Sequence, residues 1–130
     1  MYRQSTDQIT VSVLPVFIDE RSDPERNLYF WAYRVLIENA GNRAVQLINR
    51  YWHITDANGQ IEEVAGEGVV GEQPIIGPGA SYEYTSGCPL STPSGIMVGH
   101  YEMRSEDGNV LRVAIPAFSL DMPDADPVYN

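Results

Sequence analysis

Three glycines in the run GEGVVG, Gly66, Gly68 and Gly71, are the first candidates for a chemical role in this sequence. Their spacing is GxGxxG, with which dinucleotide-binding proteins bring a pyrophosphate close to the backbone at the start of a helix. Here Pro74 and Pro78 follow, and no helical pattern of apolar residues begins after Gly71. We therefore favour a structural role, as a bent strand or loop, and keep pyrophosphate or nucleotide binding at these glycines as the alternative.

Four carboxylates lie around the glycines, at Glu62, Glu63, Glu67 and Glu72. They oppose the approach of a pyrophosphate, but carboxylate oxygens are the ligands that Mg²⁺ and Ca²⁺ prefer. Their spacing differs from that of an EF-hand loop, so solvated side chains on an exposed strand are the favoured interpretation. A divalent-cation sensor that uses the Gly66 to Gly71 loop remains the alternative.

The residues expected in a nucleophilic or transition-metal site are scarce. Cys88 is the single cysteine, which excludes an intramolecular disulfide, and no cation close in sequence lowers its pKa. A small buried hydrophobe is its favoured role. His53 and His100 are the only histidines, and strand alternation predicts that each faces outward without showing that they meet. We therefore expect no catalytic residues, no metal site, no cofactor and no enzymatic activity.

Arg50 and Trp52 share one face of a predicted strand, because they are two residues apart. We expect Trp52 to be a core aromatic between two sheets. A guanidinium near the core needs a carboxylate or carbonyl partner, and a structural ion pair is the favoured role for Arg50 over a ligand clamp.

The aromatic content exceeds what the inward faces of the strands can hide, so some rings must be exposed. Phe30 and Tyr51 fall on faces that we predict to be outward, and His53 lies on the same side of its strand as Tyr51. Exposed aromatics with polar neighbours are typical of protein contact surfaces. We therefore expect an unidentified protein partner at Phe30, Tyr51 and His53, and a homodimer through an exposed sheet face is a further expectation.

The elements that must position these residues are short strands. Alternating apolar residues and turn signals such as Asn58-Gly59 predict about seven of them, near residues 9–13, 28–39, 45–56, from 60, 81–86, 96–104 and 110–117. No window has the spacing of an amphipathic helix. The pattern predicts an all-β fold, an antiparallel β-sandwich.

Length and charge set the remaining limits. The 130 residues are enough for one domain, which we place at residues 1–120, followed by an acidic, mobile tail at 121–130. The net charge of −10, with arginine as the only cationic residue besides histidine, argues against nucleic acid and anionic lipid as partners. No apolar run is long enough to span a membrane, and no secretory signal is evident, so we expect no membrane insertion and a cytoplasmic location.

Three segments together resemble one known family: 49–56 (NRYWHITD), 66–88 with its glycine run, and 92–95 (TPSG). They are similar to the ApaG family, and the likeness extends from about residue 9 to about residue 120. The resemblance implies a sandwich of the immunoglobulin or fibronectin type III kind. It also implies a link to cobalt tolerance and magnesium efflux in bacteria, and a recognition role, because related domains occur in F-box proteins and in a polymerase-interacting protein.

Overall fold

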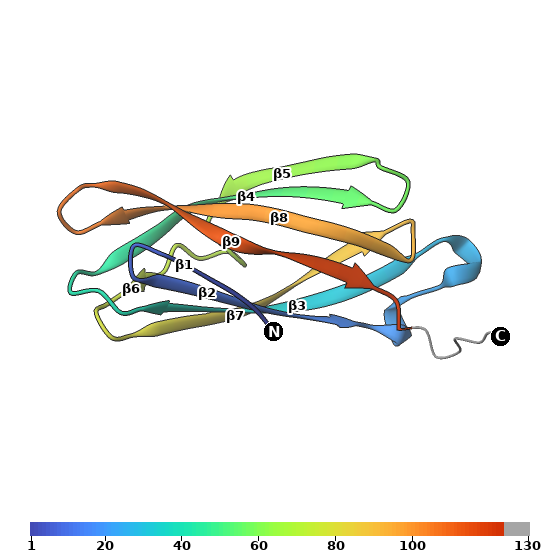
Figure 1. Ribbon diagram of the computed structural model, residues 1–130, viewed down its shortest axis with the longest axis horizontal. Helices are drawn as coiled ribbons and strands as arrows, with labels where there is room; N and C mark the ends of the chain where they lie inside the picture. Colours follow the sequence, from blue (N-terminus) through green and yellow to red (C-terminus); the bar gives the residue numbers. More distant parts are fainter. Residues whose placement is uncertain (124–130) are drawn as a thin grey trace.

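Nine strands form two antiparallel sheets that face each other in the computed structural model, which describes residues 1–123 (Figure 1). The first sheet, in the order β1-β2-β3-β7, contains β1 (Tyr2–Thr6), β2 (Ile9–Phe17), β3 (Tyr29–Asn39) and β7 (Ser81–Leu90). The second, in the order β5-β4-β8-β9, contains β5 (Ile61–Glu67), β4 (Val45–Asp56), β8 (Ser94–Ser105) and β9 (Val110–Asp121), with β6 (Ile75–Ile76) paired to the start of β4. Two short 3-10 turns, η1 (Asp19–Arg21) and η2 (Pro24–Arg26), connect β2 to β3.

The predicted antiparallel β-sandwich is confirmed, and the seven predicted strands correspond to β2, β3, β4, β5, β7, β8 and β9. Sequence reasoning missed β1 and β6. The β1–β2 hairpin turns through Asp7 and Gln8, which both have positive φ, at 47° and 70°. This geometry usually selects glycine or asparagine, so an Asp-Gln pair carries little turn signal. The two residues of β6 are too few to show any alternation.

The core is built from the inward faces of both sheets. On β3, every second residue from Tyr29 to Ile37 is buried, as the alternation predicted. Trp52 on β4 packs edge-on against Tyr33 of the first sheet, with ring centroids 5.4 Å apart, and against Phe118 on β9 at 5.8 Å. Its predicted role as the core aromatic between the sheets is confirmed, and such pairs add to the free energy gained from burial alone.

A β-bulge in β4 decides which of its side chains face the core. The pairing of β4 with β8 shifts between Leu47 and Asn49, so Ile48 is an extra residue on β4. Inward positions are therefore odd-numbered before the bulge, as at Leu47, and even-numbered after it, as at Trp52. Consequently Arg50 lies on the inward side, and Tyr51 lies on the outer face of the second sheet.

The two long sides of the sandwich differ. On one side β9 packs against β1 and β2, and the Trp31 indole Nε1–H donates to the carbonyl of Asp121 at 3.1 Å. On the other side, the segment from Glu67 to Pro74 crosses between the edge strands β5 and β7. The glycine run therefore lies between two edge strands that do not pair with each other.

The last strand ends close to the expected domain boundary, and the boundary itself stays a prediction. β9 continues through Asp121, one residue beyond the predicted limit of residue 120. The acidic tail predicted at 121–130 lies mostly outside the described residues, which end at Pro123. Within residues 1–123, no helix is long and apolar enough to cross a membrane.

The packing of Trp52 against Gly99 on β8 yields a stability prediction. A Cβ added at Gly99 would lie 2.3 Å from the carbonyl oxygen of Tyr51 and 2.8 Å from the Trp52 ring. We expect Gly99→Ala to lower the free energy of unfolding by about 1–3 kcal/mol, measured by urea denaturation. Gly77→Ala is the matched control, because a Cβ there meets nothing within 4 Å. Equal stability of the two variants would contradict the proposed close packing at Gly99.

Candidate functional site

The glycine run forms a tight hairpin, not the start of a helix. Val69 and Glu72 exchange two backbone hydrogen bonds, of 2.8 and 2.9 Å, around a two-residue turn. The turn residues Val70 and Gly71 both have positive φ, at 44° and 83°. The N–H of Gly68 donates to the carbonyl of Ile48 at 2.8 Å. The backbone N–H groups of Gly68, Val69 and Glu72 are therefore already used within the fold.

A steric limit explains Gly68, and Gly66 lies in tight contact with the Arg50 side chain. A Cβ at Gly68 would lie 2.2 Å from the carbonyl oxygen of Glu72, inside the hairpin. A Cβ at Gly66 would lie 3.1 Å from Nη1 of Arg50, which pairs with Gly66 across β4 and β5. These limits support the structural interpretation of the run, while phosphate binding at Gly66, Gly68 and Gly71 stays a prediction.

Several contacts hold the hairpin in place. Arg50 Nη1 donates to the carbonyls of Glu67 and Gly68, at 3.1 and 2.9 Å. Among residues 1–123, Arg50 forms no salt bridge, so the favoured expectation of an ion pair was wrong and backbone carbonyls take the place of a carboxylate. On β7, the Tyr82 hydroxyl donates to Glu72 Oε1 at 2.6 Å, and this hydrogen bond raises the pKa of Tyr82 to about 12.

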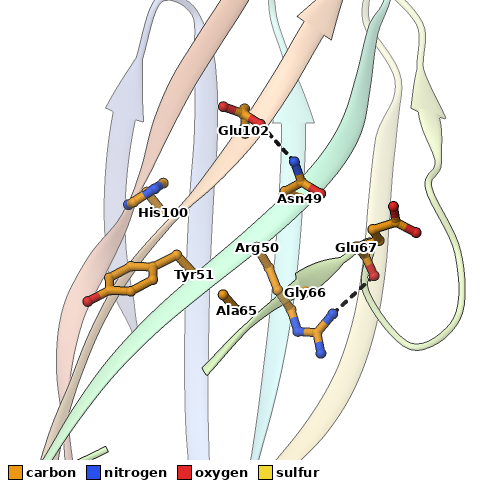
Figure 2. Close-up of a pocket in the computed structure, with 8 residues that line it drawn as sticks. All are labelled: Asn49, Arg50, Tyr51, Ala65, Gly66, Glu67, His100 and Glu102. Atoms are coloured by element: carbon orange, nitrogen blue, oxygen red, sulfur yellow. Dashed lines mark hydrogen bonds between the residues drawn. The ribbon is translucent and has the colours of Figure 1, made fainter. Parts of the chain in front are cut away.

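A hollow of about 390 Å³ lies beside this hairpin, on β4, β5 and β8 (Figure 2). Its walls are Asn49, Arg50, Tyr51, Ala65, Gly66, Glu67, His100 and Glu102. Asn49 donates to Glu102 Oε1 at 2.7 Å, which fixes one wall. In Figure 2 the Glu67 carboxylate points away from the Arg50 guanidinium, which is consistent with the absence of an ion pair between them.

The outer face of the second sheet brings several predicted residues together. Tyr51 stacks on His100 with ring centroids 5.1 Å apart, and His53 lies on the same face, paired with Val98. Partial burial and the positive charge of Arg112 lower the pKa of His100, while the Glu102 carboxylate opposes this shift. The two histidines are thus neighbours on one surface but do not pair with each other in the strand register.

Sequence reasoning missed the aliphatic residues of this face. Ile61, Ile96 and Val98 are 58%, 51% and 44% exposed. Thr55 pairs with Ile61 on one side and Ile96 on the other, so the register aligns these side chains across three strands. Strand alternation could have identified these residues. Ile96 and Val98 lie four and two residues before His100 on β8, and His100 was predicted to face outward.

Phe30 does not join this surface. It lies on β3, in the first sheet, whereas Tyr51 and His53 lie on β4. The Arg21 guanidinium carbon lies 4.1 Å from the Phe30 ring centroid, and a Cβ at Gly87 would lie 2.4 Å from that ring. Phe30 is therefore half-buried between Arg21 and β7, and the three predicted partner-surface residues do not form one contiguous patch.

The family comparison covers most of the described strands and the hairpin. The sequence profile of the ApaG domain matches residues 19–105, from η1 to the end of β8. This chain belongs to the ApaG family.

Curated relatives and solved structures align with all or nearly all of this chain. Protein ApaG of Allorhizobium ampelinum is 61% identical over 130 residues, covering all of both chains, and Protein ApaG of Paramagnetospirillum magneticum is 58% identical over the same length. The crystal structure of the ApaA protein from Bordetella pertussis has a TM-score of 0.86 at 46% identity, covering 95% of this chain and 98% of that one. The C-terminal domain of Wzt shares the fold alone, with a TM-score of 0.56 at 9% identity, covering 99% of this chain and 81% of that one.

The names of these ApaG relatives are not those of enzymes. Cys88 is buried at 5% exposure, as expected of a small core residue. Burial, with a smaller contribution from the negative charge of Glu62, raises the pKa of the Cys88 thiol to about 11. A thiol of this kind is a poor nucleophile near neutral pH. Among residues 1–123, no three His, Cys, Asp or Glu side chains gather as potential metal ligands.

The buried thiol in this ApaG domain predicts slow chemical modification. At pH 8 the raised pKa of Cys88 lowers the thiolate fraction about 100-fold relative to an unperturbed thiol, before steric protection is counted. We expect Ellman's reagent to label the native protein at least about 100-fold more slowly than the protein in guanidinium chloride. Rapid, complete labelling of the native protein would contradict the burial of Cys88 and would restore it as a candidate nucleophile.

The lowered pKa of His100 predicts a pH dependence of stability. The unfolded chain takes up a proton near the ordinary pKa of 6.5, before His100 does so in the folded protein. The contribution of His100 to the free energy of unfolding is therefore constant above pH 6.5 and decreases as the pH falls below that value. Urea denaturation between pH 8 and pH 5 should show a steeper loss for the wild type than for His100→Gln. Parallel pH profiles would contradict the shift.

Proposed function

We propose that this ApaG chain is a non-enzymatic protein-interaction module that binds its partner through the outer face of the β5-β4-β8 sheet. The observation that carries this proposal is the alignment of Ile61, Ile96 and Val98 beside Tyr51 and His53 on one face. Among residues 1–123, no other strand lies over this face (Figure 1). An exposed apolar area of this kind costs solubility unless another surface covers it.

The composition of this face resembles that of protein interfaces. Aromatic and aliphatic side chains occupy the middle. Three carboxylates stand around it at Glu63, Glu67 and Glu102, and Arg112 lies opposite Glu102 in the strand register. Protein interfaces commonly combine an apolar centre with a polar rim, and tyrosine is enriched among the residues that contribute most to binding. The acidic rim of a chain with a net charge of −10 favours a partner with basic residues around an apolar patch.

The partner supplies the link to metal handling in this proposal. The resemblance to the ApaG family implies cobalt tolerance and magnesium efflux, and we assign both to the complex that the module forms. A second copy of the chain is the alternative occupant of this face. In such a homodimer, the carboxylates around the two faces would repel each other. The charge of the chain therefore favours a different protein as the partner.

A pair of matched variants tests the interaction face. Val98 on β8 and Val16 on β2 are both exposed valines on strands inside a sheet, at 44% and 49%, but they belong to different sheets. We expect Val98→Glu to weaken partner binding by at least about tenfold, because it places a charge in the apolar centre. We expect Val16→Glu to leave binding unchanged. The measurement is capture of the tagged protein from its native lysate, with titration of the partner identified by mass spectrometry.

Two further measurements make the result decisive. Thermal melting of both variants shows whether each remains folded, and sedimentation shows whether the captured partner is a second copy of the chain. Equal binding by Val98→Glu and the wild type would reject this face as the interface. Loss of binding in Val16→Glu alone would move the interface to the first sheet.

A further inference from the structure

A second cavity opens between the two sheets, on the inner side of Arg50. Its volume is about 350 Å³, and its lining residues are Tyr33, Arg50, Trp52, Glu67, Val69, Val70, Gly71, Tyr84 and Ser86. The hairpin of the glycine run forms one wall, and β3, β4 and β7 provide the others. We propose that this cavity binds a small organic monocarboxylate, with the carboxylate on Arg50 and the apolar part against Trp52 and Val69.

Two donor groups of Arg50 have no hydrogen-bond partner within residues 1–123. Its Nη1 group is used by the carbonyls of Glu67 and Gly68, which hold the guanidinium in one orientation. Within residues 1–123, neither Nε nor Nη2 donates to another group, and no carboxylate pairs with the side chain. A guanidinium that is already oriented and still has two adjacent donor groups fits the planar, bidentate geometry of a carboxylate.

Hydroxyl groups converge on the same space. Tyr33 and Tyr84 are buried at 5% and 7% exposure, and burial raises the pKa of both hydroxyls, so both remain protonated donors near neutral pH. The positive charge of Arg50 partly opposes both shifts, as does a hydrogen bond between Tyr33 and Ser86 for Tyr33. The Tyr84 and Tyr101 hydroxyls share one hydrogen bond, so one of their two hydrogens is left to donate elsewhere.

The mouth of the cavity contains a strained residue. Val70 has a φ of 44°, a region that β-branched residues rarely occupy, and its side chain is 55% exposed. Strained backbone of this kind is concentrated at ligand-binding and catalytic sites. Val69, Val70 and the Trp52 ring line the same cavity and so supply apolar surface beside its polar groups.

Charge and size favour a monocarboxylate over a pyrophosphate or nucleotide. Arg50 is the one cation among the lining residues, and the Glu67 carboxylate points away from its guanidinium. The net charge of −10 repels a polyanion more strongly than a monoanion. The volume lies near the lower limit for small-molecule sites, about 300 Å³. This site lies on the opposite side of β4 from the proposed protein-interaction face, with Glu67 at the edge of both. It uses the glycine run as a wall instead of as phosphate-binding amides.

The test is a protein-observed NMR titration of the full chain with acetate, isovalerate and benzoate. We expect benzoate or isovalerate to give saturable shifts of the Val69 to Gly71 amides and of the Arg50 side-chain Nε–H, with acetate binding more weakly. Benzamide, which has the same ring without the charge, should not saturate these shifts. Arg50→Gln retains a donor for the hairpin carbonyls but should weaken benzoate binding at least about tenfold, as expected for loss of a charged hydrogen-bonding group.

Matched variants separate recognition from folding. Tyr33→Phe should also weaken binding while preserving the ring, and it serves as the second variant if Arg50→Gln loosens the hairpin. Arg112→Gln removes the same charge outside the cavity and should bind benzoate like the wild type. The proposal is overturned if none of the three acids gives saturable shifts, if benzamide binds equally well, or if Arg50→Gln and Tyr33→Phe both bind like the wild type. Pyrophosphate is titrated in parallel. Saturable shifts with pyrophosphate but with none of the three acids would overturn the proposal and assign the site to phosphate.

Discussion

The burial of Trp52 between the two sheets is the constraint on which the rest of the structure depends. Its ring contacts Tyr33 in the first sheet and Phe118 on β9, and Gly99 on β8 leaves the space that it needs. Because side chains of a strand alternate, this single orientation determines the neighbours: Arg50 must face inward and Tyr51 outward. The orientation of Trp52 therefore places the two proposed sites on opposite sides of β4.

The bulge at Ile48 connects this core to the glycine hairpin. The extra residue changes the parity of β4, and its carbonyl accepts hydrogen bonds from the Gly68 N–H and from Gln73 Nε2, at 2.8 and 3.0 Å. Arg50 adds two more hydrogen bonds to the same segment. The hairpin is thus anchored by the bulge carbonyl of Ile48 and by the Arg50 guanidinium, which shows how a bulge can support a candidate site.

Alternation and turn signals were enough to predict the fold, because they depend on local physical chemistry. The seven longer strands and the inward position of Trp52 were predicted correctly. The candidate site was predicted less completely. Tyr51 and His53 do lie together on an outer face, but the missed Ile96 and Val98 form much of it. Phe30 has the expected outward direction but belongs to the other sheet, and alternation cannot tell which outward faces are shared.

The sequence alone was enough to predict the family, the antiparallel sandwich, the strong negative charge and the core role of Trp52. This was possible because periodicity, composition and short motifs are properties of neighbouring residues. Only the tertiary structure decided that Arg50 bonds to carbonyls instead of a carboxylate, and that the GxGxxG run is a hairpin at the wall of a cavity. Those outcomes depend on strand register and on the bulge at Ile48, which bring together residues distant along the chain.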